Sequence, residues 1–144
     1  MAPAILLHGE EKEYGVKYYG IPSGYEFQSL VEDIIDISRG EIDLPKSIKE
    51  KIENIDKDIE ILVFVTPTCP YCPRAVRSAH KYAIINQRID AAMIEAMEFE
   101  DLSRQYNVMA VPKIVIRVNG EDKEEFEGAY PDAAFVEKIY ESLK

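Results

Sequence analysis

The chain has 144 residues, of which 47% are hydrophobic, and its formal net charge at pH 7 is −10. This length suits one domain, or one domain plus a fragment, and the apolar content is enough for a buried core. The negative charge would repel nucleic acid and anionic membranes, so we expect neither as a partner. No run of 18 apolar residues occurs, and residues 1–4 hold no basic side chain ahead of the apolar residues 5–7. We therefore expect a cytoplasmic protein with no membrane span and no secretory signal peptide.

The first forty residues predict a β-hairpin followed by a helix. Apolar and alternating residues predict strands at residues 4–8 and 13–19, joined by a polar turn at residues 9–12. Residues 20–24 contain two glycines and a proline and break this pattern. A helix is then expected over residues 25–38, because apolar residues recur at helical spacing on one face: Phe27, Leu30, Val31, Ile34 and Ile37.

The middle of the chain predicts two helices around a buried strand. Pro45 suits the start of a helix over residues 45–55, and the apolar, β-branched residues 59–65 predict a buried strand. The helix that follows should reach about residue 87, and Pro73 should remove one backbone hydrogen bond early in it and bend it. The expected core-facing residues are Ile48, Ile52 and Ile55 in the first helix and Ala75, Val76, Ala79, Ala83 and Ile84 in the second.

The last third of the chain predicts alternating strands and helices. The expected elements are a strand at 89–95, a helix at 99–106, a loop at 108–112, a strand at 113–118, a hairpin turn at Asn119 and Gly120, a strand at 123–127 and a helix at 132–143. From residue 45 onward the predicted order is therefore α-β-α-β-α-β-β-α. This order indicates an α/β fold with a central mixed sheet flanked by helices.

Cys69 and Cys72 follow the buried strand and stand at the start of the next predicted helix. Pro70 suits the first helical position, because its missing N–H loses no hydrogen bond there. Cys69 is therefore expected near the N-cap, with Cys72 one turn into the helix on the same side. Free backbone N–H groups and the helix dipole would stabilise a thiolate at Cys69, and Cys72 could then attack a mixed disulfide formed there. The sequence predicts a redox-active dithiol.

Two other roles for the cysteine pair stay open. A zinc half-site is one of them, but there is no second cysteine pair and His8 and His80 lack zinc-finger spacing, so further ligands would have to come from another chain. A structural disulfide is the other, although it would close a minimal loop and stabilise the fold weakly. We expect His80 and the adjacent Lys81 to be surface positions of the helix.

The predicted order of elements, with Cys-Pro-Tyr-Cys at the start of a helix and Val111-Pro112 before a strand, resembles the thioredoxin fold over residues 45–144. In that family the proline before this strand is cis and faces the dithiol, and the resemblance gives this place to Pro112. It also implies that Val111 offers its backbone groups to an extended substrate segment. The alternative is that Pro112 only begins an edge strand. The sequence between the cysteines is also typical of glutaredoxins.

Segments near the N-terminus echo segments near the C-terminus. Residues 3–7 match residues 112–116, and residues 30–34 match residues 135–139. The first forty residues therefore resemble the second half of another thioredoxin unit that begins at its own cis-proline, Pro3. Two tandem units in one cytoplasmic chain are typical of the protein disulfide oxidoreductases of thermophilic archaea and bacteria, and abundant Ile, Glu and Lys with no Trp also favour a thermophile. This chain resembles the C-terminal portion of such a protein.

We divide the chain into residues 1–42, a partial thioredoxin-like unit without an active site, and residues 43–144, a complete unit with Cys-Pro-Tyr-Cys. A hairpin and one helix cannot enclose a core alone, and the strand after Pro3 would present an open apolar edge. We expect the partial unit either to pack on the complete unit or to pair with a second copy in a homodimer.

The surroundings of the dithiol depart from those of thioredoxins. Thioredoxins place an Asp six residues before the first cysteine, where it assists proton transfer, and Val63 stands there in this chain. Glu95 or Glu98 could substitute for that Asp, and the alternative for each is a solvated surface carboxylate. Thr68 replaces the Trp of thioredoxins and makes the rim smaller and more polar, while Tyr71 is expected at the rim in contact with substrate.

The implied reaction is thiol–disulfide exchange, in which Cys69 attacks a protein disulfide and Cys72 resolves the mixed disulfide. We expect no metal and no organic cofactor. The expected partners are protein disulfides and an enzyme resembling thioredoxin reductase that recycles the dithiol. Two alternatives remain: a glutaredoxin-type reductase that takes electrons from a small thiol, and a non-catalytic module whose cysteines hold zinc or an iron–sulfur cluster between two chains.

Overall fold

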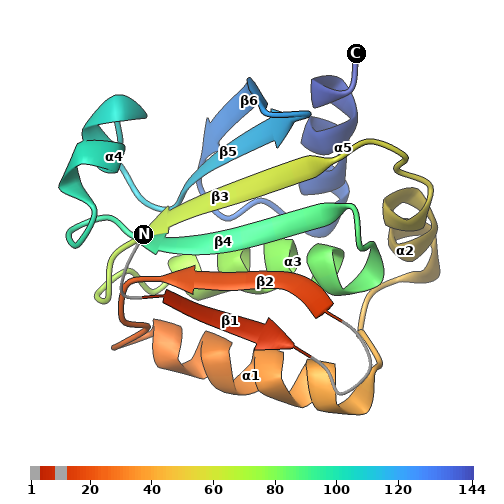
Figure 1. Ribbon diagram of the computed structural model, residues 1–144, viewed down its shortest axis with the longest axis horizontal. Coiled ribbons are helices and arrows are strands. Elements are labelled where there is room, and N and C mark those ends of the chain that lie inside the picture. The colour runs from red at the N-terminus through yellow and green to blue at the C-terminus, as the bar shows by residue number, and fades with distance from the viewer. Residues whose placement is uncertain (1–3, 9–12) are drawn as a thin grey trace.

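The computed structural model describes residues 4–8 and 13–144, so Pro3 and the turn predicted at residues 9–12 lie outside the described residues. The described residues form one mixed sheet flanked by helices, as predicted (Figure 1). The elements in chain order are β1 (Ala4–His8), β2 (Glu13–Tyr19), α1 (Glu26–Arg39), α2 (Lys46–Glu53), β3 (Ile59–Val65), α3 (Cys72–Ile85), β4 (Ile89–Glu95), α4 (Glu100–Gln105), β5 (Lys113–Val118), β6 (Glu121–Glu127) and α5 (Asp132–Ser142). Each strand and helix expected from the sequence is present.

The sheet has six strands in the order β1-β2-β4-β3-β5-β6. Its middle is the parallel set β2, β4 and β3, and antiparallel pairs complete both sides. The central strands β3 and β4 are almost wholly buried, because helices or side chains cover both of their faces. Burial on both faces explains why β3 and β4 are apolar along most of their length.

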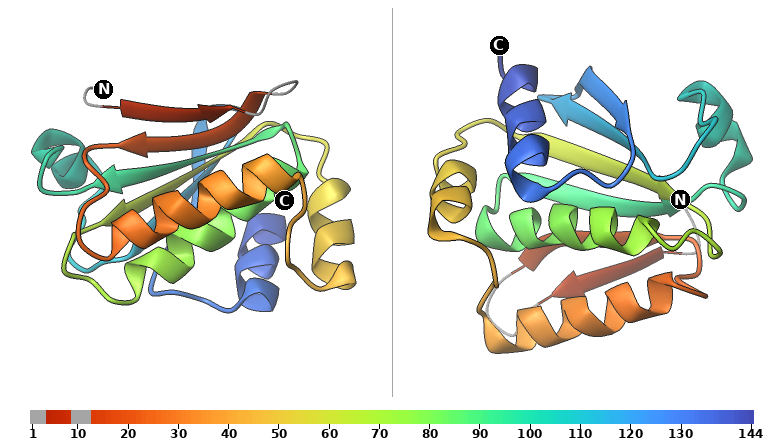
Figure 2. Two further views of the ribbon diagram at one scale, coloured as in Figure 1. Left: turned by 90° about the horizontal axis from the view of Figure 1, so that it is seen from below. Right: turned by 180° about the vertical axis from the view of Figure 1, so that it is seen from behind.

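Helices α1, α3 and α5 lie across one face of the sheet (Figure 2). The larger core fills the space between this face and helices α2, α3 and α5. A smaller core lies on the opposite face, where Phe99 and Leu102 pack beside Phe64 and Tyr106. No helix in the described part of the chain is long and apolar enough to cross a bilayer.

The N-terminal hairpin and α1 pack on the rest of the chain. β2 pairs in parallel with β4, and α1 packs against α3. Val16 and Tyr18 of β2 are fully buried in the main core. Of the two arrangements expected for the partial unit, the structure shows its packing on residues 43–144. The division of the chain after residue 42 stays a prediction.

The most deeply buried residues of α1 are polar and lie outside the apolar stripe predicted for this helix. The buried residues of α1 are Glu26, Ser29 and Asp33, whereas Phe27 and Ile34 are 59% and 47% exposed. Of the apolar stripe predicted for this helix, Leu30 and Ile37 are partly buried and pack against the main core, so only part of the stripe turns outward. The physical reason for the burial of Asp33 is that Arg77 of α3 faces α1 and pairs with Glu32, Asp33 and Asp36.

Candidate functional site

The cysteine pair lies where parallel strands end. β2, β4 and β3 run in the same direction, so their carboxyl ends meet at one edge of the sheet. Three loops form this carboxyl edge: residues 20–25 after β2, residues 66–71 after β3 and residues 96–99 after β4 (Figure 1). In open α/β sheets, binding and active sites are found at this edge.

Cys69 and Cys72 form a disulfide, and their Cα atoms are 5.5 Å apart. Cys72 is fully buried and Cys69 is 8% exposed, so Cys69 is the cysteine that a substrate can reach. The backbone N–H of Cys72 donates to Sγ of Cys69 at 3.2 Å, and this sulfur lies 3.9 Å from the carbonyl oxygen of Val111. A backbone donor directed at the sulfur stabilises negative charge on Cys69.

Helix α3 begins later than predicted, at Cys72. Pro70 therefore precedes the helix and is exposed, and Cys69 lies two residues before the N-cap residue Tyr71. Pro73 lies in the first turn, where its missing N–H has no helical partner to lose. The predicted loss of a helical hydrogen bond at Pro73 is wrong for this reason. The helix N-terminus still faces Cys69, because the Cys72 N–H binds its sulfur.

The rim of the site has the residues expected from the sequence. Thr68 and Tyr71 are exposed, and the exposed fraction of Tyr71 is 71%. The Val111–Pro112 peptide is cis, as the resemblance to thioredoxins implies, and Pro112 is buried. The carbonyl oxygen of Val111 is the atom of that residue that lies near Sγ of Cys69. Contact of these residues with a substrate stays a prediction.

Glu95 and Glu98 lie at the end of β4 and just after it. Glu95 is buried, and desolvation raises the pKa of its carboxyl. One of its oxygens accepts the backbone N–H of Glu98 at 2.7 Å, and the other has no hydrogen-bond partner. The exposed Glu98 carboxylate instead accepts the backbone N–H of Ile21 at 2.7 Å. No hydrogen bond among the described residues joins either carboxylate to a cysteine, and a role in proton transfer stays a prediction.

Glu26, which was not predicted as a site residue, is a buried carboxyl in the first turn of α1. The preceding residue, Tyr25, donates its backbone N–H to the carbonyl oxygen of Pro67 at 3.1 Å. Desolvation is the main cause that raises the pKa of Glu26 to about 7. One carboxyl oxygen accepts the Ser29 hydroxyl at 3.0 Å, and the other is buried without a partner. The only sequence signal is an acidic residue at the start of a helix, which is ordinary at that position.

An ion-pair cluster joins α1 to α3. Arg77 contacts Asp33 at 2.5 Å, Asp36 at 2.6 Å and Glu32 at 2.9 Å. Nδ1 of His80 lies 2.5 Å from Asp33, so the expectation that His80 is a surface residue is wrong. Desolvation acts to raise the pKa of Asp33, but the charge and hydrogen bond of His80 and the charge of Arg77 keep that pKa below its ordinary value.

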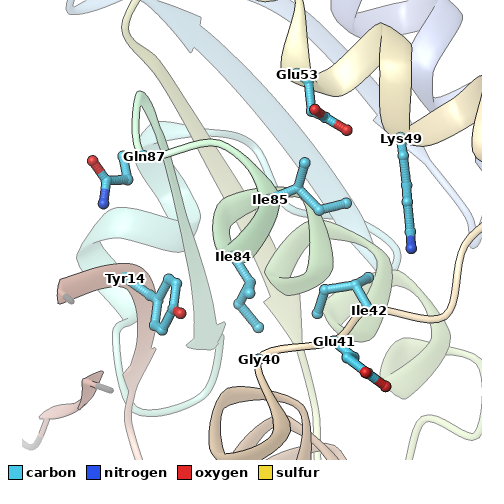
Figure 3. A pocket seen from close by; sticks show the side chains of 9 residues that line it. All are labelled: Tyr14, Gly40, Glu41, Ile42, Lys49, Glu53, Ile84, Ile85 and Gln87. Atoms are coloured by element: carbon cyan, nitrogen blue, oxygen red, sulfur yellow. The ribbon is translucent and has the colours of Figure 1, made fainter. Parts of the chain in front are cut away.

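A hollow of about 870 Å³ lies at the far end of α3 from the cysteines (Figure 3). Ile84 and Ile85 belong to its wall, and α3 spans 14 residues from Cys72, so the hollow is roughly 20 Å away from the disulfide. None of the site residues predicted from the sequence lines it. Within the described residues, no group of three His, Cys, Asp or Glu side chains could hold a metal ion.

Comparison with known proteins gives relatives of two kinds. The chain is 33% identical over 120 residues to the AhpF subunit of alkyl hydroperoxide reductase from Staphylococcus aureus strain Mu50, an alignment that covers 83% of this chain and 23% of the relative. The structure of AhpF from Enterococcus faecalis matches with a TM-score of 0.85 at 30% identity, covering 94% of this chain and 64% of that chain. A protein disulfide oxidoreductase from Aeropyrum pernix matches with a TM-score of 0.83 at 34% identity, covering 98% of this chain and 59% of that chain.

The sequence analysis named the protein disulfide oxidoreductases as the class that this chain resembles, and the match to the protein from Aeropyrum pernix agrees with it. The likeness to AhpF was not predicted. This chain spans less than two thirds of the length of each of these proteins. A model of the thioredoxin domain matches residues 57–141, which is more than half of the chain and includes both cysteines and Pro112. The chain therefore belongs to the thioredoxin domain family.

Proposed function

We propose that the chain catalyses thiol–disulfide exchange with the disulfides of other proteins through Cys69 and Cys72. The observation that carries this proposal is the Cys69–Cys72 disulfide at the turn from β3 to α3, with the N–H of Cys72 directed at the more accessible sulfur. The likeness to a protein disulfide oxidoreductase supports the same reaction class.

In the reductive direction, the thiolate of Cys69 attacks one sulfur of a substrate disulfide. The bond between the two substrate sulfurs breaks, and one substrate thiolate leaves and takes up a proton. Cys72 then loses its proton and attacks Sγ of Cys69, which releases the second substrate thiol and leaves the Cys69–Cys72 disulfide. Two electrons and two protons pass to the substrate, and the reverse steps oxidise a substrate dithiol.

Cys72 is buried, so its proton needs an acceptor inside the protein. We infer that Glu26 is the first candidate, because it is buried, its pKa is raised to about 7, and the residue before it binds Pro67 in the loop that leads to the cysteines. Glu95 is the second candidate, since it is buried with one free oxygen. Glu98 is weaker, because it is exposed to solvent and not buried in the protein.

Insulin reduction by dithiothreitol tests the proposal. The unmodified chain should accelerate precipitation of the insulin B chain, and Cys69→Ser should abolish this acceleration. Cys72→Ser should accumulate a mixed disulfide with insulin, because the resolving thiol is gone. A folded chain that leaves the insulin rate unchanged would refute the proposal. A requirement for glutathione would instead favour the glutaredoxin-type alternative.

A second candidate function is electron transfer to a peroxide-reducing partner. The similarity of this chain to the AhpF subunit of alkyl hydroperoxide reductase favours it. The test is to mix the reduced chain with a purified, oxidised peroxidase of the alkyl hydroperoxide type. Faster electron transfer to this partner than to insulin would favour the second function, and slower transfer would favour general protein disulfides.

Assembly and cellular setting belong to the same proposal. We infer a cytoplasmic protein of a thermophile, recycled by an enzyme resembling thioredoxin reductase. We also infer a homodimer that forms through β1. Among the described strands β1 pairs only with β2, so its other edge is open, and its Leu6 is 51% exposed. Sedimentation velocity tests the dimer, and a monomer at micromolar concentration would contradict it.

A further inference from the structure

Exposed apolar side chains gather around the carboxyl edge of the sheet. They come from the loops after β2, β3 and β4 and from the loop before β5. Monomer surfaces rarely expose several large apolar side chains together unless they bind something. The residues and their exposed fractions are Ile21 (60%), Tyr25 (53%), Tyr71 (71%), Met97 (70%) and Met109 (81%).

Two of these residues, Ile21 and Tyr25, belong to the loop of the partial unit at residues 20–25, and this loop is held against the complete unit. The N–H of Tyr25 donates to the carbonyl oxygen of Pro67, two residues before Cys69, and the N–H of Ile21 donates to Glu98. Gly24 approaches Pro67 so closely that an added Cβ would collide with the same oxygen. The backbone of the loop is therefore fixed on both sides, while its two apolar side chains remain exposed.

Charge at this edge is acidic. Glu98, Glu100 and Asp101 are exposed in the loop after β4 and at the start of α4, and the chain as a whole carries −10. The exposed cations nearby are fewer: Arg104, which pairs with Asp101, and Arg74 in the first turn of α3. An acidic apolar surface favours a partner that carries apolar and basic side chains. Because Cys69 lies at the same edge, a partner of this kind must also present a disulfide.

We propose that residues 20–25 form one wall of the surface on which the protein substrate docks, and that Ile21 and Tyr25 contact it. The occupant is an extended segment of a disulfide-bonded protein, with apolar residues next to its cysteine and basic residues farther out. This inference rests on the proposed function and adds a substrate class to it. It also gives the partial unit a role in substrate selection besides its structural one.

The experiment compares kcat/KM for a protein disulfide, insulin, with kcat/KM for a small one, hydroxyethyl disulfide. A small disulfide reaches Cys69 without covering the wall, so the ratio of the two values reports docking. Ile21→Ser and Tyr25→Ser should each lower this ratio about fivefold, through lost apolar contact. The matched control is Ile35→Ser, which removes a 43% exposed isoleucine of α1 away from the edge and should leave the ratio unchanged. Tyr25→Phe keeps the apolar ring and should retain the ratio.

Circular dichroism and thermal unfolding of each variant separate a folding defect from a docking defect. An unchanged ratio in Ile21→Ser and Tyr25→Ser would overturn the inference, and so would an equal fall in Ile35→Ser. If the unmodified chain reduces neither disulfide, the proposed function itself fails, which is a distinct result.

Two disulfide-bridged peptides that differ only in their flanking residues test the basic character of the substrate. The peptide with flanking lysines should have a kcat/KM roughly tenfold above that of the peptide with flanking glutamates at low salt, and this difference should shrink at about 0.5 M salt. Equal values for the two peptides at low salt would overturn this part of the inference.

Discussion

An oxygen of Asp33 lies 2.5 Å from a guanidinium nitrogen of Arg77, in a place where the Asp33 side chain is fully buried. Asp33 belongs to α1, and Arg77 belongs to α3, the helix that begins at Cys72. The other oxygen of Asp33 accepts the hydroxyl of Tyr18 and contacts His80. The helix that begins at Cys72 therefore depends on α1 for the carboxylates that neutralise Arg77, whose side chain is only 13% exposed.

Asp33→Asn should destabilise the fold by about 3 kcal/mol, because it leaves Arg77 without one of its carboxylates inside the protein. Urea unfolding measures this change. The control is Asp101→Asn, whose carboxylate is fully exposed in its pair with Arg104 and should change the free energy of unfolding by less than about 0.5 kcal/mol. Similar small losses in both variants would show that the cluster contributes little to stability.

Glu26→Gln should change how stability depends on pH. Folding raises the pKa of this carboxyl from 4.5 to about 7, so the folded state binds the proton more tightly than the unfolded state does. The contribution of this group to the free energy of unfolding is fully present below about pH 4.5. It falls by about 3 kcal/mol as the pH rises through 7. The variant should therefore exceed the unmodified chain in stability by about this amount at pH 8 and by much less at pH 4. A difference that is independent of pH would contradict the shift.

The same variant tests the inferred role of Glu26 in proton transfer. If its carboxyl takes the proton of Cys72, the rate of insulin reduction in the unmodified chain should rise as pH increases through about 7, and Glu26→Gln should lose this rise. An unaltered pH–rate profile would assign the role to another group.

Gly24→Ala should reduce activity by disturbing the loop that precedes the cysteines. The added Cβ would collide with the carbonyl oxygen of Pro67, at a backbone φ of +61°. Gly40→Ala is a matched control, because Gly40 has a φ of +70° and nothing within 4 Å of the added Cβ. Both variants should lose about 1 kcal/mol of stability from the left-handed backbone, but only Gly24→Ala should lower kcat/KM for insulin. Equal activities in the two variants would show that the approach to Pro67 has no effect on the site.

Removal of residues 1–42 should prevent cooperative folding of the remainder. The truncation uncovers the edge of β4, removes the buried Val16 and Tyr18, and takes away the carboxylates that pair with Arg77. Thermal unfolding of the shortened chain should be broad or absent, since an exposed apolar edge also favours aggregation. A sharp transition near that of the whole chain would show that residues 43–144 are an independent domain.

Much of the fold was predictable because its signals are local. The runs at 59–65 and 89–95 are apolar along most of their length, and both strands have the predicted bounds. The cysteine pair was found for the same reason, since a strand, a turn and Cys-Pro-Tyr-Cys are contiguous in the chain. The start of α3 was less predictable, because Pro70 and Pro73 both suit a first helical turn.

The predictions that failed concern α1 and the residue it binds. An apolar stripe normally marks the buried face of a helix, yet only Leu30 and Ile37 of this stripe pack on the core, while Phe27 and Ile34 are exposed and Asp33 is buried. His80 was expected at the surface of its helix and is buried. Each of these burials depends on a partner more than forty positions away along the chain, and hydrophobic periodicity carries no information about such a partner.

The sequence by itself determined the elements, the dithiol and the class of fold, because these depend on residues that are neighbours in the chain. Only the tertiary structure decided that the loop at residues 20–25 lies beside the loop of the cysteines and that Glu26, the next residue, is buried. The physical reason is the parallel pairing of β2 with β4 and of β4 with β3, which carries the ends of three separate segments to one edge of the sheet.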